Sequence, residues 1–275
     1  MFTRKDLMRL LVPLIIEQIL IVLVGMVNVV MAAAVGEAAV SGVSLVESIN
    51  ILIVQIMSAL ATGGAVISSQ YLGKNQSEDA CKAAGQLIGV TSFLSVVVTA
   101  VALVGNTGLL KVIFGRVDES VMNHAVIYFR ITALSYPFIA VYNSCAALFR
   151  SMGNSKVSMA VSMAVNIINV TGNAVCIYVF HLGVAGLAIP TLFCRIAAAA
   201  VMMILIQHPG NEVRIRRLDE LKPDMPMIRK ILSVGIPNGL ESGMFQFGKL
   251  MLQSLVSSLG TAALASYAVS SNLVT

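Results

Sequence analysis

Seven apolar segments dominate this sequence, and each is long enough, at about 20 residues or more, to cross the hydrocarbon core of a bilayer. Charged residues are scarce: they make up 11% of the chain, against about 25% in soluble domains, while 57% of the residues are hydrophobic. The sequence therefore predicts an all-α integral membrane protein. The predicted spans are residues 10–34, 44–70, 86–113, 125–149, 157–180, 184–206 and 230–258, and an eighth begins near residue 262.

Lysines and arginines gather on one side of these predicted spans. If the N-terminus is cytoplasmic, that side receives thirteen of the eighteen basic residues, and the outer loops receive only Lys111 and Arg116. Because positive charge marks cytoplasmic loops, the bias predicts a multi-pass protein of the cell membrane with a cytoplasmic N-terminus. This topology accounts for the net charge of +5, so no nucleic-acid partner is expected. The thirteen are Arg4, Lys5, Arg9, Lys74, Lys82, Arg150, Lys156, Arg214, Arg216, Arg217, Lys222, Arg229 and Lys230.

The start of the sequence recurs further along the chain without a gap. Pro237 follows Pro13 by 224 residues, and at the same spacing Glu241 matches Glu17. Six predicted spans separate the two copies, and an even number of crossings returns the chain to the side it left. The copies therefore share an orientation, as in transporters built from two parallel repeats. The other matching pairs are Gly36 with Gly260, Ala38 with Ala262 and Ala39 with Ala263.

This repeat predicts how the chain is organised. Residues 1–206 are expected to form a six-helix N-terminal lobe, and residues 230–275 the truncated start of a C-terminal lobe. Between them, residues 207–229 contain prolines and charges that are typical of a cytoplasmic linker. The second copy ends shortly after its first span. We therefore expect an incomplete two-lobe transporter, whose partner is the missing C-terminal lobe or another copy of the chain.

Six motifs, in this order and at this spacing, give the sequence a family resemblance. They are LxxPxxxEQ from Leu10, MVNVVMAAAVGEAAVSGVSL at 26–45, YFRITALSYPF at 128–138, LFRSMGNSKVSM at 148–159, NIINVTGN at 166–173 and LGVAGLAIPT at 182–191. Together they resemble the MATE family of multidrug and toxic compound exporters. The resemblance implies a twelve-helix transporter, of which this chain holds six helices, the seventh and the start of the eighth. It also implies two six-helix lobes in a V, which export organic cations in exchange for Na⁺ or H⁺.

Two positions depart from the pattern of the family. Asn28 stands where the first helix of such transporters usually has an aspartate that is implicated in ion coupling, and Asn173 stands at a second acidic position. Thr191 agrees with a polar position of the family. An amide can coordinate an ion, but it cannot take up and release a proton near neutral pH. Proton coupling through these positions is therefore not expected, whereas Na⁺ could bind near Asn28, Asn169 and Asn173.

Helical spacing brings several polar residues of the first lobe together. Asn166, Asn169 and Asn173 follow one another at i, i+3 and i+7, so they lie on one face of a helix. Asn28 follows Glu17 by eleven residues, which returns to nearly the same side of the helix about 16 Å further along. Both faces are expected to border one cavity for substrate or ion. Alternatively, the asparagines hold the bundle together through interhelical hydrogen bonds.

Several charged residues lie inside the predicted spans, and most of them allow two interpretations. Glu17 and its counterpart Glu241 either belong to the cavity or brace the bundle against Arg195 or Lys249, because an unpaired charge in the membrane is costly. Lys249 either repels Na⁺ or balances a carboxylate in the cavity, or it extends toward the interface or pairs between lobes. Glu47, near the outer start of the second predicted span, is expected to be an interfacial residue.

Catalytic chemistry finds no support in the sequence. The four cysteines lack close spacing, and the motifs HExxH, GxSxG and the P-loop are absent. We therefore expect no enzyme, no cofactor and no metal centre. The only ion expected to bind is the coupling ion, Na⁺ or H⁺. Three functions stay open. The first is a secondary-active exporter of organic cations, and the second is a flippase of lipid-linked oligosaccharides, which needs a more basic cavity. The third is a half-protein without transport that only assembles with other membrane proteins.

Overall fold

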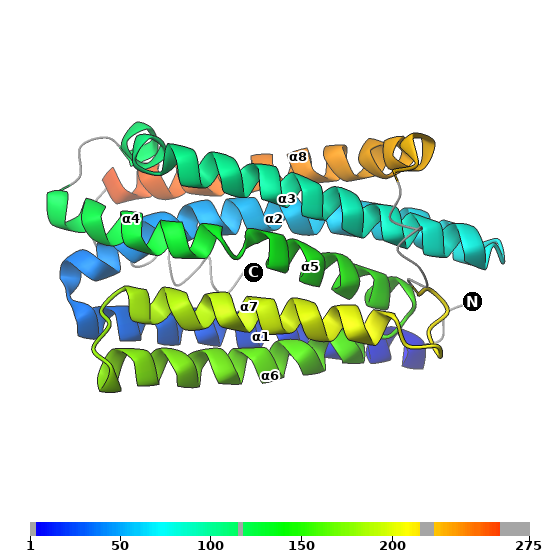
Figure 1. Ribbon diagram of the computed structural model, residues 1–275, viewed down its shortest axis with the longest axis horizontal. Helices are drawn as coiled ribbons and strands as arrows, with labels where there is room; N and C mark the ends of the chain where they lie inside the picture. Colours follow the sequence, from blue (N-terminus) through cyan, green and yellow to red (C-terminus); the bar gives the residue numbers. More distant parts are fainter. Residues whose placement is uncertain (1–3, 115–117, 215–222, 259–275) are drawn as a thin grey trace.

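The computed structural model describes residues 4–114, 118–214 and 223–258, and all of their regular structure is helical (Figure 1). For residues 4–10, 114 and 249–258 it describes the backbone alone. The helices are α1 (Arg4–Val35), α2 (Glu37–Gly73), α3 (Ser77–Phe114), α4 (Glu119–Ala133), α5 (Tyr136–Ser151), α6 (Ser155–Ala174), a short π-helix η1 (Val175–Val179), α7 (Ala185–Ile206) and α8 (Met225–Ser258).

Five helical segments are long and apolar enough to cross a membrane, and α4 and α5 together, bent by 49°, form a sixth. These six correspond to the first six predicted spans. Residues 230–258, the seventh predicted span, lie in α8, but α8 is not among the candidates found within the described residues. Polar residues such as Asn238, Glu241 and Gln246 lower the hydropathy of its sequence. The five segments are Leu11–Val35, Glu37–Gly73, Ser77–Ile113, Ser155–Val179 and Ala185–Ile206.

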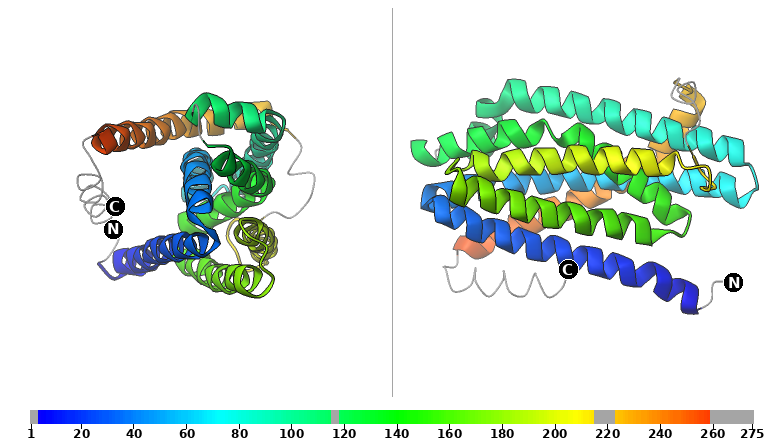
Figure 2. Two further views of the ribbon diagram at one scale, coloured as in Figure 1. Left: turned by 90° about the vertical axis from the view of Figure 1, so that its left-hand side faces the viewer. Right: turned by 60° about the horizontal axis from the view of Figure 1, so that its bottom comes forward.

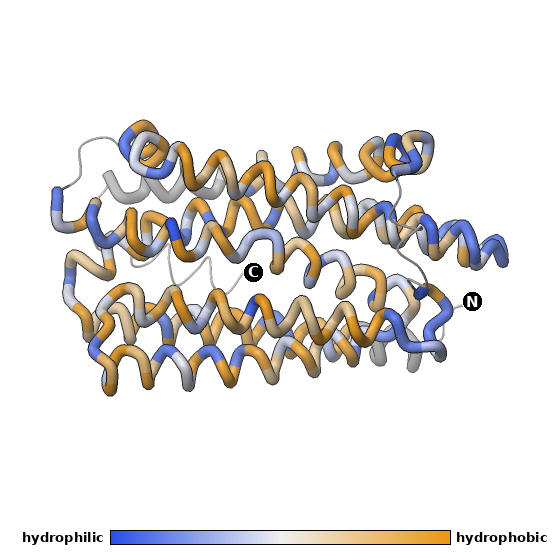
Figure 3. The backbone as a smooth tube through the Cα atoms, in the orientation of Figure 1, coloured by the Kyte–Doolittle hydropathy of each residue, from blue (hydrophilic) through white to orange (hydrophobic). Residues whose placement is uncertain are grey.

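The helices pack into a bundle with an apolar outer surface. In Figures 1 and 2, α1, α6 and α7 lie together on one side and α3 and α8 on the other, with α2 and the pair α4–α5 between them. Large apolar side chains face outward along α3, where Val104 is 91% exposed and Phe93 is 73% exposed. Hydrophilic residues are concentrated near the helix ends, most clearly on the right of Figure 3. This distribution suits a protein whose solvent is lipid.

The break between α4 and α5 follows from Pro137. Proline has no N–H, so the carbonyl of Ala133, four residues earlier, loses its partner within the helix. The Thr99 hydroxyl of α3 donates a hydrogen bond to this carbonyl at 3.1 Å. The Ser135 hydroxyl donates to the carbonyl of Thr132 at 2.5 Å. The neighbouring groups thus satisfy the freed backbone, and the bent span can remain inside the membrane.

Helix α8 packs along α2 and touches α3. Where α2 and α8 cross, a Cβ atom added at Gly63 would lie 2.6 Å from the Cα of Gly235, so only glycine permits this approach. Nearby, the Asn238 side chain donates to the Ala59 carbonyl at 2.8 Å. Ile231 of α8 is fully buried in an apolar cluster that also contains residues of α2, α3, α5 and α7.

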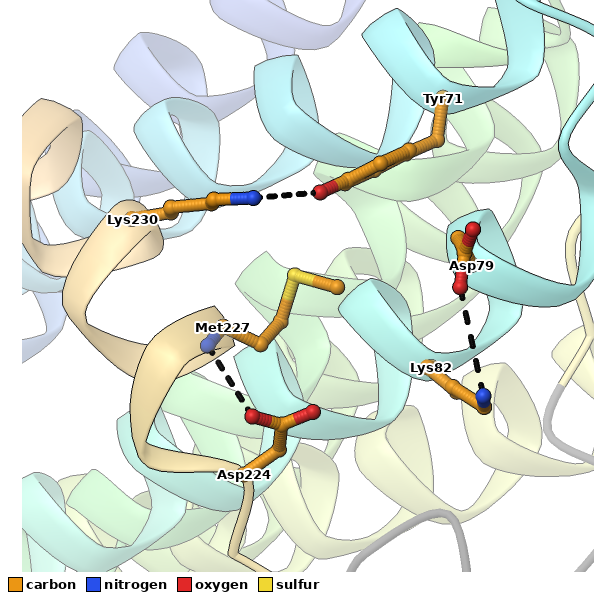
Figure 4. A network of polar contacts seen from close by, with 6 residues as sticks. All are labelled: Tyr71, Asp79, Lys82, Asp224, Met227 and Lys230. Carbon is orange, nitrogen blue, oxygen red and sulfur yellow. Dashed lines mark hydrogen bonds and ion pairs between the residues drawn. The ribbon is translucent and has the colours of Figure 1, made fainter.

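Polar contacts hold the N-terminal end of α8 (Figure 4). The Asp224 carboxylate accepts a hydrogen bond from the backbone N–H of Met227 at 3.3 Å, which caps the helix, and Pro226 suits its first turn. Lys230 donates to the Tyr71 hydroxyl of α2 at 2.9 Å. Since α8 begins at Met225, it includes the last residues of the expected linker, 207–229.

Candidate functional site

A cavity of about 640 Å³ lies within the helix bundle and is lined by residues of α1, α2, α4, α5, α6 and α7. It lies within the 300–1,000 Å³ that is typical of pockets for small molecules. Five of the residues predicted from the sequence border it: Glu17, Asn28, Asn166, Asn169 and Thr191. Further polar and charged residues of its wall are Gln18, Glu47, Asn50, Gln55, Ser58, Tyr128, Tyr142, Asn143, Arg150, Ser162 and Arg195.

Four of the predicted residues form one hydrogen-bonded group, here called the amide cluster: Asn28, Asn169, Asn173 and Thr191. Asn173 is fully buried, and its amide nitrogen donates to Asn28 Oδ1 at 2.9 Å and to Asn169 Oδ1 at 3.2 Å. Asn169 Nδ2 donates in turn to Thr191 Oγ1 at 3.0 Å. The cluster therefore links α1, α6 and α7, and Asn28, Asn169 and Thr191 also border the cavity.

The amide cluster offers oxygen atoms to a cation but no negative charge. Asn28 Oδ1 and Asn169 Oδ1 already accept hydrogen bonds from Asn173, whose own Oδ1 is buried without a partner among the described residues. A sodium ion would have to replace these hydrogen bonds, and no carboxylate of the cluster would compensate its charge. As arranged here, the cluster fits a network of interhelical hydrogen bonds better than it fits Na⁺.

Glu17 is buried in the wall of the cavity, where 7% of it is exposed. Tyr142 of α5 donates to its Oε1 at 3.2 Å, while Oε2 is buried with no hydrogen-bond partner among the described residues. Arg195, one of the two partners considered for Glu17, forms no ion pair with it among the described residues, and its Nη1 donates to Ser135 Oγ at 2.6 Å. Arg150, near the end of α5, lines the same cavity.

Glu47 also lines the cavity, although the sequence favoured an interfacial residue over a ligand. Helix α2 begins at Glu37, earlier than the predicted span, so Glu47 lies in its third turn. The Tyr128 hydroxyl donates to Glu47 Oε1 at 2.6 Å, and Asn50 Nδ2 donates to the same atom at 3.1 Å. Asn50 Oδ1 accepts in turn from Tyr136 at 2.7 Å. Sequence reasoning missed this group because its members come from three helices.

The remaining predicted residues lie outside the amide cluster. Asn166 donates to Ser162 Oγ at 3.3 Å on its own helix, at the wall of the cavity. Glu241 is exposed on α8 and is not part of the cavity wall, so the structure does not bring it near Glu17. Lys249 lies within α8, but its side chain falls outside the described residues, as do the repeat positions Gly260, Ala262 and Ala263.

Comparison with known proteins decides the family. A model described as MatE matches residues 13–175, more than half of the chain, from within α1 to the start of η1. The chain belongs to the MATE family. MATE proteins are transporters, so this chain is a multi-pass membrane protein and not an enzyme.

Two MATE relatives align with nearly the whole chain but with only part of their own length. The chain is 27% identical over 269 residues to the uncharacterized transporter YisQ of Bacillus subtilis (strain 168), covering 95% of this chain and 58% of YisQ. It is 25% identical over 272 residues to the multidrug export protein MepA of Staphylococcus aureus (strain MRSA252), covering 98% of this chain and 59% of MepA. The chain thus spans less than two thirds of the length of these relatives.

A solved structure confirms the predicted MATE fold. A MOP superfamily transporter from Pyrococcus furiosus superposes with a TM-score of 0.89 at 19% identity, over 98% of this chain and 60% of the other. The predicted fold, an all-α membrane bundle that matches about 60% of a MATE transporter, is therefore correct. At this identity the likeness concerns the fold alone.

Proposed function

We propose that this chain forms the substrate-binding lobe of a secondary-active exporter that exchanges organic cations for H⁺. The observation that carries the proposal is Glu17, a carboxylate that is almost fully buried in the wall of a cavity of about 640 Å³, with one oxygen unpartnered among the described residues. A carboxylate in the membrane interior must be paired, hydrated or protonated. Glu17 has no ion pair among the described residues, so we infer that a proton or a cation in the cavity meets this requirement more fully than water does.

This requirement supplies a physical basis for antiport. When an organic cation occupies the cavity, its charge stabilises the ionised carboxylate and a proton leaves; when a proton returns, the cation is released. Two ligands that disfavour each other in one cavity exchange with reciprocal coupling. Alternating access then carries them in opposite directions, which requires a second lobe opposite this one. The remaining helices of a C-terminal lobe or another copy of the chain would have to provide it.

The arrangement favours H⁺ over Na⁺ as the coupling ion. Asn28 and Asn173 of the amide cluster do not titrate, and their hydrogen bonds to each other leave no oxygen-lined site with negative charge. Glu17, a carboxylic acid that is able to bind a proton, lies in the same cavity. Na⁺ coupling is the alternative, and it would require the amide cluster to open around the ion.

The cavity gives less support to a lipid-linked oligosaccharide as the substrate. Such a substrate carries a negatively charged pyrophosphate, which would need an excess of basic groups. Among the described residues of the wall, Arg150 and Arg195 are balanced by Glu17 and Glu47. The lining is otherwise rich in aliphatic side chains, including Ile21, Val24, Ile51, Val54 and Ile139. The relative MepA is itself a multidrug export protein.

Binding of tetraphenylphosphonium to the purified chain tests this proposal. Because a proton competes with the cation, binding should weaken as the pH falls, by up to tenfold per pH unit for one-for-one exchange. Glu17→Gln should flatten this dependence, since glutamine cannot bind the proton. Glu241→Gln, which changes an exposed acid outside the cavity wall, is the matched control and should keep it. Binding that depends on Na⁺ but not on pH would contradict H⁺ coupling.

A further inference from the structure

The cavity contains a second carboxylate whose surroundings differ from those of Glu17. Glu47 is only half-buried, and both hydrogen bonds that the structure gives it end on Oε1: one from Tyr128 at 2.6 Å and one from Asn50 at 3.1 Å. Two donors thus position one oxygen of this side chain. Glu17 has one longer hydrogen bond, at 3.2 Å.

Buried groups fix the position of Glu47. Asn50 is 1% exposed and Tyr128 is 5% exposed, and Tyr136, which is fully buried, holds Asn50 by donating to its Oδ1. Tyr128 belongs to α4 and Tyr136 begins α5, so the carboxylate is tied to both halves of the broken span. A group held in this way can bind a ligand without first losing rotational freedom.

The charge of Glu47 is not cancelled by a salt bridge within the part of the chain that the structure describes. Arg195 lines the same wall, and its Nη1 donates to Ser135 Oγ at 2.6 Å, beside the break between α4 and α5. Tyr128 and Tyr142 add aromatic rings to the same wall, and aromatic rings attract organic cations.

We propose that Glu47 is the fixed anionic group that binds the positive centre of the organic substrate, with Tyr128 as its positioning residue, while Glu17 carries the exchangeable proton. This inference rests on the proposed function and assigns cation binding and proton exchange to two different carboxylates. Two carboxylates of one site commonly take different roles when their environments differ. The aliphatic and aromatic lining points to lipophilic cations that bear one delocalised or quaternary charge. Neutral molecules of the same shape lack the group that Glu47 recognises.

Binding of tetraphenylphosphonium to single variants of the purified chain, at one pH near 8, tests the role of Glu47. Glu47→Gln is expected to raise the Kd at least about tenfold, because it removes the charge that faces the ligand. Triphenylphosphine oxide, a neutral probe of similar shape, should bind both forms equally. Glu241→Gln serves as the control and should change neither Kd. An unchanged Kd for tetraphenylphosphonium in Glu47→Gln would overturn the inference and leave the role of Glu17 standing.

Two further measurements separate binding from folding. Glu47→Asp keeps the charge but shortens the side chain, so it should recover part of the lost affinity if charge is what matters. Tyr128→Phe should weaken cation binding by a few-fold, with the pH dependence that belongs to Glu17 retained. If Glu47→Asp binds no better than Glu47→Gln and Tyr128→Phe binds like the unsubstituted chain, Glu47 is not the cation site. No binding by the unsubstituted chain would overturn this inference and the proposed function together.

Discussion

Gly63→Ala tests whether α8 packs on α2 as closely as the structure shows. The added Cβ would lie 2.6 Å from the Cα of Gly235, 2.8 Å from its N and 3.1 Å from the carbonyl carbon of Val234. All three are backbone atoms, so no side chain can rotate away. To restore an ordinary contact of 3.4 Å, α8 has to retreat by about 0.8 Å at this point.

The expected cost follows from this overlap. Overpacking a tight contact costs about 1–3 kcal/mol. Alanine is the better helix former by about 1 kcal/mol, so the substitution needs a control that contains the same gain. Gly108→Ala in α3 provides it, because a Cβ there meets nothing within 4 Å. Relative to Gly108→Ala, Gly63→Ala should therefore lose the full 1–3 kcal/mol of stability.

Thermal unfolding in detergent measures the difference. The chain has no tryptophan, but Cys81, Cys145 and Cys194 are buried, so a maleimide dye that fluoresces on reaction reports their exposure. Gly63→Ala should unfold several degrees below Gly108→Ala. Gly235→Ala should cost less, because its nearest neighbour is the end of the flexible Leu60 side chain. Equal unfolding temperatures for Gly63→Ala and Gly108→Ala would show that α2 and α8 do not meet as described.

Three other predictions concern the bent span, the amide cluster and the topology. Thr99→Val removes the hydroxyl that satisfies the Ala133 carbonyl and should lower the free energy of unfolding by about 1–3 kcal/mol in the same assay. Thr62→Val is the control and should change little, because the Thr62 hydroxyl is exposed and bonds within α2. Equal effects of the two substitutions would contradict the role of Thr99. Asn28→Asp places a titratable group in the cavity wall and should steepen the pH dependence of cation binding; an unchanged slope would exclude this position from coupling. A reporter fused after Gln76 should lie in the cytoplasm and one after Asp118 outside, and the opposite labelling would overturn the predicted orientation.

The helices were predictable because their signal is local. Long apolar runs identify the first six spans, and spacing alone placed Asn169 and Asn173 on one face, where the structure finds them hydrogen-bonded. Pro13 and Pro237, the start of the predicted repeat, both lie inside helices, α1 and α8. Glu17 and Asn28 border the same cavity, as eleven residues of helix predict.

The partners of these residues were not predictable, because they come from distant parts of the chain. Tyr142 reaches Glu17 across 125 positions, and Asn173 reaches Asn28 across 145. No local pattern encodes such pairs. The place of Glu47 in the cavity wall was missed for another reason: hydropathy marks where a helix becomes strongly apolar, not where it begins, and α2 starts at Glu37, before the predicted span. The break at Pro137 likewise divides a span that was predicted as one segment, 125–149.

Proton release on ligand binding tests the central claim most directly. When tetraphenylphosphonium is added to the purified chain in weakly buffered detergent solution, the account predicts the release of about one proton per cation bound, which a pH indicator can count. Glu17→Gln should bind the cation without releasing a proton, and Glu241→Gln should behave like the unsubstituted chain. Cation binding that releases no proton from the unsubstituted chain, or that releases as much from Glu17→Gln, would contradict the exchange of an organic cation for a proton at Glu17.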